Sequence, residues 1–155
     1  MGKLTFTAAS VTIATGATER CLHYWDRSGV VRPSEQANGA GFYRRYTATE
    51  VVLVSIVKRM RRAGVSLQQI RRAMPVIEDV VSGARSEGAQ VHLQTGKGPP
   101  LLIITRMAGA ENGRAVVDAL KGGQLVLALA VEPVRKEVER RLRRQGFRPE
   151  AVGTG

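Results

Sequence analysis

A short stretch near the N-terminus concentrates the side chains with which a protein can do chemistry. It reads TERCLHYWDRSGVVRP, from Thr18 to Pro33, and it holds Arg, Cys, His, Tyr, Trp and Asp side chains close together. Residues of these types can coordinate a metal ion, provide a nucleophile and its base, or contact the groove of a nucleic acid. The geometry of the element that carries them separates these possibilities.

Helical geometry argues against the first two. Successive residues of an α-helix are rotated by about 100°, so Cys21 and His23 point roughly 160° apart and cannot share a metal ion or act as a nucleophile and base. His23 and Asp26 together make only half of a site, and the only other histidine is His92. A single cysteine also excludes an internal disulfide. We therefore predict no catalytic residue, no metal site and no cofactor, and we expect the protein not to be an enzyme.

The same geometry gives the segment two faces. The inward face suits core packing and comprises Cys21, Leu22 and Trp25. The outward face carries donors for phosphates and base edges, namely Arg20, His23, Tyr24 and Arg27. A short helix expected at residues 7–14 precedes it across a tight TGA turn, and the Thr18 hydroxyl is expected to cap the second helix. This spacing predicts a helix-turn-helix; the alternative is that the outward side chains are only solvated.

A second basic and aromatic cluster, FYRRY, ends the Gly-rich segment of residues 34–46, which we call the wing. The wing is expected to form a β-hairpin that lays Arg44 and Arg45 along a phosphate backbone, with Tyr43 or Tyr46 packed beneath. The residues predicted to bind DNA are Thr18, Arg20, His23, Tyr24, Arg27, Tyr43, Arg44, Arg45 and Tyr46.

The charge distribution favours the same class of partner. The formal net charge of the 155 residues is +11, and residues 1–75 hold 12 Lys/Arg against 4 Asp/Glu, whereas residues 76–155 hold 12 against 9. A basic half with clustered aromatics is typical of a protein that binds a phosphate backbone, although a solvated face or a surface for anionic lipid has the same charge. The first residues have no apolar core of signal-peptide length, and the longest apolar run, residues 125–131, is too short for a bilayer. We expect no membrane contact and a cytoplasmic protein that is nucleoid-associated when bound to DNA.

The rest of the chain indicates an α+β fold: a mostly helical winged helix-turn-helix domain followed by a small ββαβα domain with its helices on one face of the sheet. Capping boxes at residues 47–50 and 66–69 begin two helices, and Pro75 is expected to end or kink the second of them. Strands are predicted at residues 91–95, 101–105 and 124–131, and helices at 112–120 and 133–145. The predicted parts are a DNA-binding domain at 4–81, a linker at 82–90, a dimerisation or effector-like domain at 91–146, and a flexible tail at 147–155.

The first of these parts resembles the MerR-type transcriptional regulators. The segments TGATERCLHYWDRSGVVRPS and GFYRRYTATEVVLVSIVKRMRRAGVSLQQIRRAM follow the family pattern of a T-G-V-S-x-R-T-L-R-Y-Y-[DE] recognition segment, a Y-R-x-Y wing and a helix pair ending in G-x-S-L-x-x-I. Cys21, His23 and Trp25 depart from it, because the pattern has Thr, Arg and Tyr there. A neutral His23 gives up one charge that would neutralise a phosphate. The later segment VVDALKGGQLVLALAV is similar to a small actinobacterial-type subgroup with a compact α+β C-terminal domain.

The resemblance implies a homodimer that binds an inverted-repeat promoter element, distorts the double-stranded promoter DNA and so assists RNA polymerase. The long coiled coil by which such proteins usually dimerise is not evident, since residues 76–88 are short and interrupted by Gly. Dimerisation is then expected through the second domain, by a strand edge or by the stripe of Val134, Val138 and Leu142. The alternative function is a DNA-architectural or excisionase-like winged-helix factor without direct transcriptional output. No residue pattern identifies a small-molecule effector.

Overall fold

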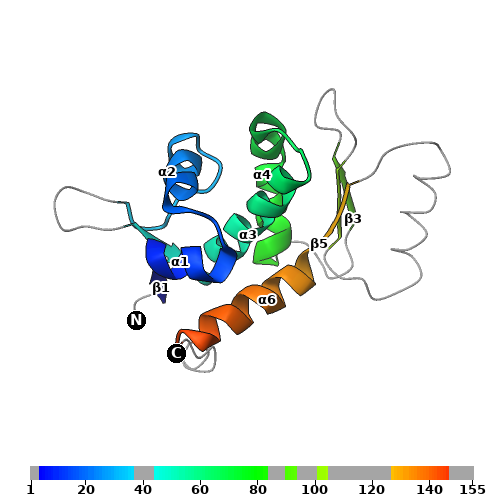
Figure 1. Ribbon diagram of the computed structural model, residues 1–155. Coiled ribbons are helices and arrows are strands. Elements are labelled where there is room, and N and C mark those ends of the chain that lie inside the picture. The colour runs from blue at the N-terminus through cyan, green and yellow to red at the C-terminus, as the bar shows by residue number, and fades with distance from the viewer. Residues whose placement is uncertain (1–3, 37–43, 84–89, 94–100, 105–126, 147–155) are drawn as a thin grey trace. The chain divides into compact units, whose positions relative to one another are not determined.

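A computed structural model describes residues 4–36, 44–83, 90–93, 101–104 and 127–146 (Figure 1). The chain divides into two units, one made of residues 1–58 with 135–155 and the other of residues 59–134. The elements in chain order are β1 (Thr5–Thr7), α1 (Ala8–Thr15), α2 (Glu19–Arg27), β2 (Arg45–Thr47), α3 (Ala48–Arg62), α4 (Leu67–Ser82), β3 (Gln90–Leu93), β4 (Leu101–Ile104), β5 (Leu127–Ala130) and α6 (Val131–Arg144).

The turn between α1 and α2 is closed by local hydrogen bonds, as the sequence predicts for a helix-turn-helix. The Thr15 side chain is buried, and its Oγ1 donates to the Val11 carbonyl at 2.7 Å and accepts from the Ala17 N–H at 3.1 Å. Gly16 has a φ of 76°, in the left-handed region that glycine adopts without strain. Thr18 Oγ1 then accepts from the Cys21 N–H at 3.2 Å and caps α2. Both predicted helices and the predicted cap are confirmed.

Strand β1 was not predicted, and it fixes one end of the wing. It pairs antiparallel with β2, with Thr5 opposite Thr47 and Thr7 opposite Arg45. The Arg45 guanidinium strengthens this pairing, because its Nε donates to Thr5 Oγ1 at 2.7 Å and its Nη2 to the Thr5 carbonyl at 3.1 Å. Glu35 forms an isolated antiparallel bridge with Arg45. The two described ends of the wing therefore lie side by side, while residues 37–43 fall outside the described residues.

Glu50 joins the start of α3 to the start of the wing. Its carboxylate accepts from the Thr47 N–H at 2.8 Å, while Thr47 Oγ1 accepts from the Glu50 N–H at 3.2 Å, so the predicted capping box is present. The same carboxylate also accepts from the Ser34 N–H at 3.1 Å and from the Ser34 hydroxyl. Glu50 is thus both a local cap and a contact between segments 16 residues apart in the sequence.

Helix α4 runs through Pro75, so of the two expected effects of Pro75 the end of the helix is wrong, while a kink stays a prediction. A reciprocal capping box between Ser66 and Gln69 begins the helix, and Gly83, with a φ of 79°, ends it. Proline removes only one backbone hydrogen bond and needs space for its ring, and Pro75 lies on the exposed side of the helix. The buried stripe continues on both sides of it, with Ile70, Ala73, Met74, Ile77, Val80 and Val81. Burial of that stripe outweighs the loss of the hydrogen bond.

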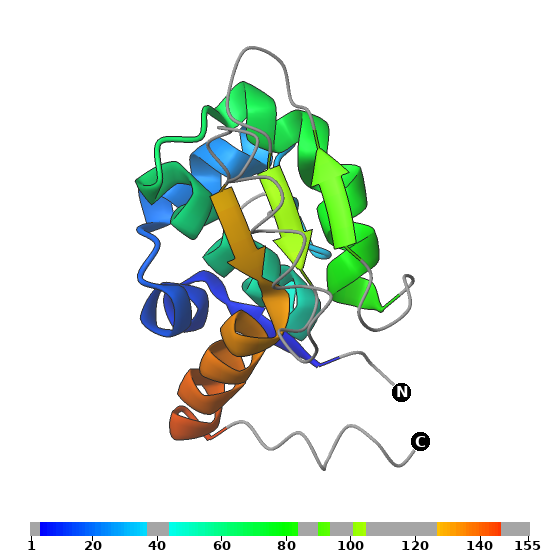
Figure 2. The ribbon, with the colours of Figure 1, turned by 90° about the vertical axis from the view of Figure 1, so that its right-hand side faces the viewer.

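Strands β3, β4 and β5 form a three-stranded sheet in that order. β3 pairs antiparallel with β4, and β4 pairs parallel with β5 (Figure 2). The three predicted strands are therefore confirmed within the described residues, except that Val131, the last residue of the third predicted strand, begins α6 instead. The predicted helix at residues 112–120 and most of the predicted linker lie outside the described residues, and the predicted domain boundaries stay a prediction.

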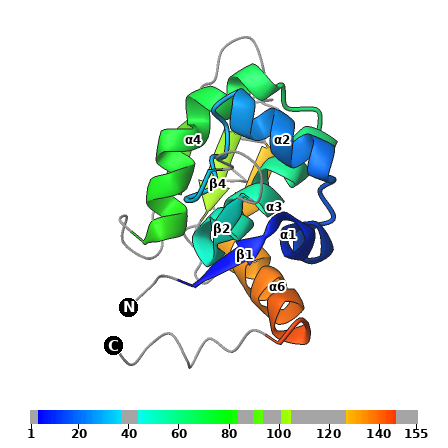
Figure 3. The same cartoon turned by 90° about the vertical axis from the view of Figure 1, so that its left-hand side faces the viewer.

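Helix α6 follows β5 directly, with Pro133 in its first turn as predicted. Its Arg141 Nη1 donates to the Ala14 carbonyl at 3.2 Å, and Gln145 Nε2, just beyond the helix, donates to the Ser10 carbonyl at 3.1 Å. Figure 3 shows α6 beside α1. The stripe expected to form a dimer interface is buried within the single chain, at 3% exposure for Val134, 1% for Val138 and 0% for Leu142. That hypothesis is wrong, because these side chains already pack within the chain.

The two capping boxes give a test of the Glu50 contact. Glu50→Ala leaves the N–H groups of Thr47 and Ser34 without their acceptor, so we expect the free energy of unfolding to fall by about 1–3 kcal/mol. Gln69→Ala removes the equivalent side chain from an exposed and purely local box and should cost about 1 kcal/mol or less. Urea denaturation of both variants measures the difference. Equal losses would mean that the contact to Ser34 adds nothing.

Candidate nucleic-acid interface

Helix α2 has the two faces that its sequence predicts. Leu22 is 2% and Trp25 5% exposed, and Cys21 is half-buried. The other side presents Arg20, His23, Tyr24 and Arg27 to solvent. Within the described residues, the Arg20 and Arg27 side chains make no hydrogen bond or ion pair, so their guanidinium donors remain available. An exposed helix face with unused donors and an exposed tyrosine ring can contact phosphates and base edges.

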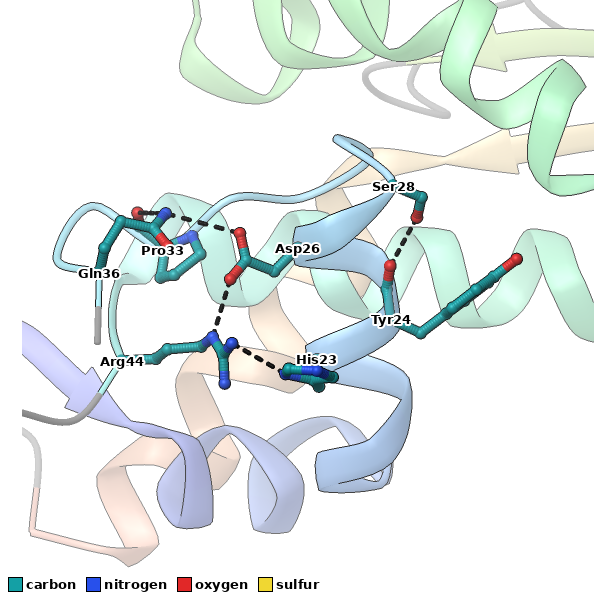
Figure 4. Close-up of polar contacts among 7 residues, drawn as sticks. All are labelled: His23, Tyr24, Asp26, Ser28, Pro33, Gln36 and Arg44. Atoms are coloured by element: carbon teal, nitrogen blue, oxygen red, sulfur yellow. Dashed lines mark hydrogen bonds and ion pairs between the residues drawn. The ribbon is translucent and has the colours of Figure 1, made fainter. Parts of the chain in front are cut away.

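Asp26 is the member of α2 whose role was not predicted. It is a buried carboxylate, 8% exposed, and it accepts from Arg44 Nε at 2.7 Å (Figure 4). Gln36 Nε2 lies 3.5 Å from its other oxygen and also donates to the Pro33 carbonyl at 3.3 Å. A buried carboxylate requires such partners, because leaving water costs it hydration. Asp26 therefore attaches both described ends of the wing to α2.

Arg44 extends this contact outward to His23. Its Nη2 lies 2.8 Å from His23 Nδ1, while its Nε bonds Asp26. The three side chains thus form a chain from a buried carboxylate to an exposed imidazole, and the Tyr24 ring extends away from them (Figure 4). Two of the three guanidinium nitrogens of Arg44 are engaged inside the protein. Its predicted place along a phosphate backbone stays a prediction, and only Nη1 has no partner among the described residues.

The other predicted wing residues differ in position. Arg45 is half-buried and its guanidinium bonds Thr5, with Glu35 at 3.9 Å. Tyr46, the middle residue of β2, is 0% exposed. The prediction that it contacts DNA is therefore wrong, because its side chain is part of the buried core. Tyr43 lies outside the described residues. Thr18 is exposed, but its hydroxyl caps α2.

Lysine 58 of α3 shows how a basic side chain can serve the scaffold. Lys58 Nζ donates to the Thr15 carbonyl at 3.3 Å, at the C-terminal end of α1, where a positive charge is favoured. The same ammonium lies 2.5 Å from where a Cβ on Gly16 would stand. Any side chain at Gly16 would therefore displace this contact as well as strain the turn.

Two other kinds of feature are absent from the described residues. No group of three or more His, Cys, Asp or Glu residues that could hold a metal ion occurs among the described residues. In that part of the chain, no helix is long and apolar enough to cross a membrane.

The burial of Tyr46 predicts an unusual response to substitution and to pH. Its hydroxyl finds no hydrogen-bond partner among the described residues, and its pKa is raised from 10.0 to about 12, mainly by burial and also by the Asp26 carboxylate. Tyr46→Phe should therefore keep the free energy of unfolding or raise it by up to about 1 kcal/mol, whereas Tyr46→Ala should lower it by about 3–5 kcal/mol.

The sign of the pH effect follows from the raised pKa. The folded protein binds the phenolic proton more tightly than the unfolded chain, so this stability is present below pH 10 and is lost as pH rises from 10 to about 12. Tyr46→Phe lacks that loss, and Tyr24→Phe at an exposed tyrosine serves as the control. Urea denaturation of the three proteins below pH 10 and between pH 10 and 12 measures how much the free energy of unfolding falls. A parallel pH dependence in wild type and Tyr46→Phe would contradict the assignment.

Comparison with known proteins finds that the sequence is similar to those of transcription regulators. Residues 6–76 match the model of the MerR HTH family regulatory proteins. An uncharacterized HTH-type transcriptional regulator of Mycobacterium tuberculosis is 34% identical over 124 residues, 79% of this chain and 51% of that relative. The nodulation protein NolA of Bradyrhizobium elkanii is 31% identical over 84 residues, 54% of this chain and 37% of that relative. The HTH-type transcriptional regulator HmrR of Rhizobium leguminosarum is 31% identical over 65 residues, 42% and 48% of the two chains. The chain thus spans about half the length, or less, of these curated relatives.

Proposed function

Because the chain belongs to the MerR family of helix-turn-helix regulatory proteins, we propose that it binds double-stranded promoter DNA at a specific sequence and regulates transcription there. The family consists of DNA-binding transcriptional regulators and is not enzymatic. One observation carries the proposal for this chain. The second helix of the helix-turn-helix presents Arg20, His23, Tyr24 and Arg27 on one exposed face. Arg side chains donate hydrogen bonds to base edges and phosphates, and the Tyr hydroxyl donates to phosphates.

The scaffold around this face supports a reading role. The Thr15 hydroxyl and Gly16 close the turn before α2, and Asp26 and Glu50 hold the ends of the wing. A side chain that discriminates between bases has to be held by rigid elements, since a hydrogen bond weakens steeply with misalignment. A helix whose caps and neighbours are fixed in this way can present the same donors to every site.

A homodimer on an inverted repeat is the finer part of the proposal. Two copies of α2 would enter the major groove of two half-sites, one helical turn or a multiple of it apart. Distortion of the promoter between the half-sites would then assist RNA polymerase, because bending and underwinding of DNA depend on the protein's contacts at both ends. The buried α6 stripe leaves a sheet edge, β3 or β5, as the proposed contact between copies. A cytoplasmic location belongs to the same proposal.

Binding-site selection with purified protein, followed by footprinting, tests sequence recognition. We expect a protected inverted repeat with one half-site per α2. Protection that is uniform along the DNA would contradict sequence-specific regulation and would favour an architectural role. Reporter transcription from a promoter that contains the selected site then tests the regulatory output.

Arg20 gives the test at the level of a single residue. Arg20→Ala should weaken binding to the selected site by about 1–3 kcal/mol and broaden the preference at one base pair of each half-site, if its guanidinium pairs a base. Arg143→Ala, at an exposed arginine of α6, is the matched control for loss of one charge. Fluorescence anisotropy with the selected and a scrambled duplex measures both effects. Unchanged affinity in Arg20→Ala would remove Arg20 from the interface.

The dimer is tested by stoichiometry. We expect analytical ultracentrifugation to find two chains on each duplex that carries the full inverted repeat, and weaker binding to an isolated half-site, because each half contributes its own phosphate contacts. One chain bound per full repeat, with equal affinity for a half-site, would overturn the dimer.

A further inference from the structure

We infer that His23 reads a base edge through its Nε2–H, and that Arg44 and Asp26 are positioning residues that fix this donor. The inference rests on the proposed function and names the residue that determines part of its sequence preference. It depends on the hydrogen bonds that connect the three side chains.

The first step concerns which nitrogen of His23 carries the proton. A guanidinium group has five N–H donors and no acceptor. Because Arg44 Nη2 lies 2.8 Å from His23 Nδ1, that nitrogen has to accept the hydrogen bond. A neutral imidazole that accepts at Nδ1 carries its proton on Nε2. The contact therefore selects a neutral ring with one donor on its other edge.

The second step concerns how firmly this arrangement is held. Arg44 cannot turn freely, because its Nε is bonded to the buried Asp26 carboxylate at 2.7 Å. The Asp26 backbone belongs to α2 itself, one turn from His23. The imidazole is thus fixed from the helix that carries it, through a side chain that comes from the wing. Two nitrogens of Arg44 are engaged in these hydrogen bonds, so fewer of its donors are available to contact a phosphate.

The third step concerns what the fixed donor recognises. His23 lies on the exposed face of α2 beside Arg20 and Tyr24, so its Nε2–H is accessible to DNA in the major groove. Guanine presents two adjacent acceptors there, N7 and O6, whereas cytosine presents the N4 amino donor. A single neutral N–H donor therefore favours an acceptor edge, guanine first, and disfavours cytosine. It carries no charge and releases no counterion on binding.

The alternative is a phosphate contact by His23, and the two predict different salt dependence. Removal of a charged side chain that contacts a phosphate weakens binding for all sequences and lowers the salt slope by roughly 0.9. A neutral donor on a base changes the preference at one base pair and leaves the slope unchanged. His23→Ala should therefore bind the selected site roughly three- to tenfold more weakly, the equivalent of one hydrogen bond.

The positioning role is tested on the free protein by nitrogen-15 NMR, independently of DNA. The chain has two histidines, so in a His92→Gln variant every imidazole signal comes from His23. We expect a neutral His23 with an unprotonated Nδ1 and a protonated Nε2. Arg44→Met should produce a mixture of tautomers, whereas Asp26→Asn, which keeps an acceptor for Arg44 Nε, should retain more of the Nε2–H form than Asp26→Leu. A proton on Nδ1 of His23 in the wild-type protein would overturn the positioning role. So would a tautomer ratio that stays the same in the Arg44→Met variant.

The base-reading role is tested by site selection with His23→Ala, Arg44→Met and the double variant. We expect all three to lose preference at the same base pair, and the double variant to lose no more of it than His23→Ala. His23→Arg should restore a preference there and steepen the salt slope. A lower slope with unchanged base preference in His23→Ala would overturn base reading in favour of a phosphate contact. A wild-type protein without any selected site would overturn the proposed function and base reading together, while the NMR result would still decide the positioning role.

Discussion

The carboxylate of Asp26 is the constraint on which the arrangement of the candidate interface depends. It lies on α2, is 8% exposed, and accepts from Arg44 and Gln36, which flank the part of the wing that is not described. A carboxylate that leaves water without such partners loses most of its hydration energy. The wing ends have therefore to stay close to α2 as long as Asp26 is buried. One buried charge thus couples the helix that faces solvent to the segment that follows it.

Glu50 supplies a second, independent contact of the same kind. Its carboxylate satisfies backbone donors at Ser34 and Thr47, while Arg45 bonds Thr5 in the adjacent strand. Each of these groups would serve a purely local role in an isolated helix or strand. In the folded chain each also contacts a segment distant in sequence, so the helix-turn-helix and the wing base form one hydrogen-bonded unit. Such cross-connections restrict the orientation of exposed side chains more than packing alone.

The features that the sequence predicts correctly depend on contacts between residues three or four apart. The Thr18 cap, both capping boxes and the two faces of α2 belong to this class, because side-chain type and spacing determine them. The features that were missed depend on distant partners. β1 is only three residues long and exists through its pairing with β2, and Asp26 could be assigned a role only once Arg44 was beside it. The alternation of Thr5, Phe6 and Thr7 was the one available signal for β1. Pro75 was misjudged because its exposed side of α4 is set by tertiary packing.

The contacts of α6 with α1 affect the order in which the first unit can fold. The donors at Arg141 and Gln145 are separated from their acceptors at Ala14 and Ser10 by 127 and 135 residues. Contacts between residues so far apart in the sequence require the closure of a long loop. They therefore lower the rate of folding. A chain that leaves the ribosome from its N-terminus therefore exposes these α1 carbonyls until α6 has been synthesised. These two hydrogen bonds to α1 can form only after residues translated long after the helix-turn-helix have been made.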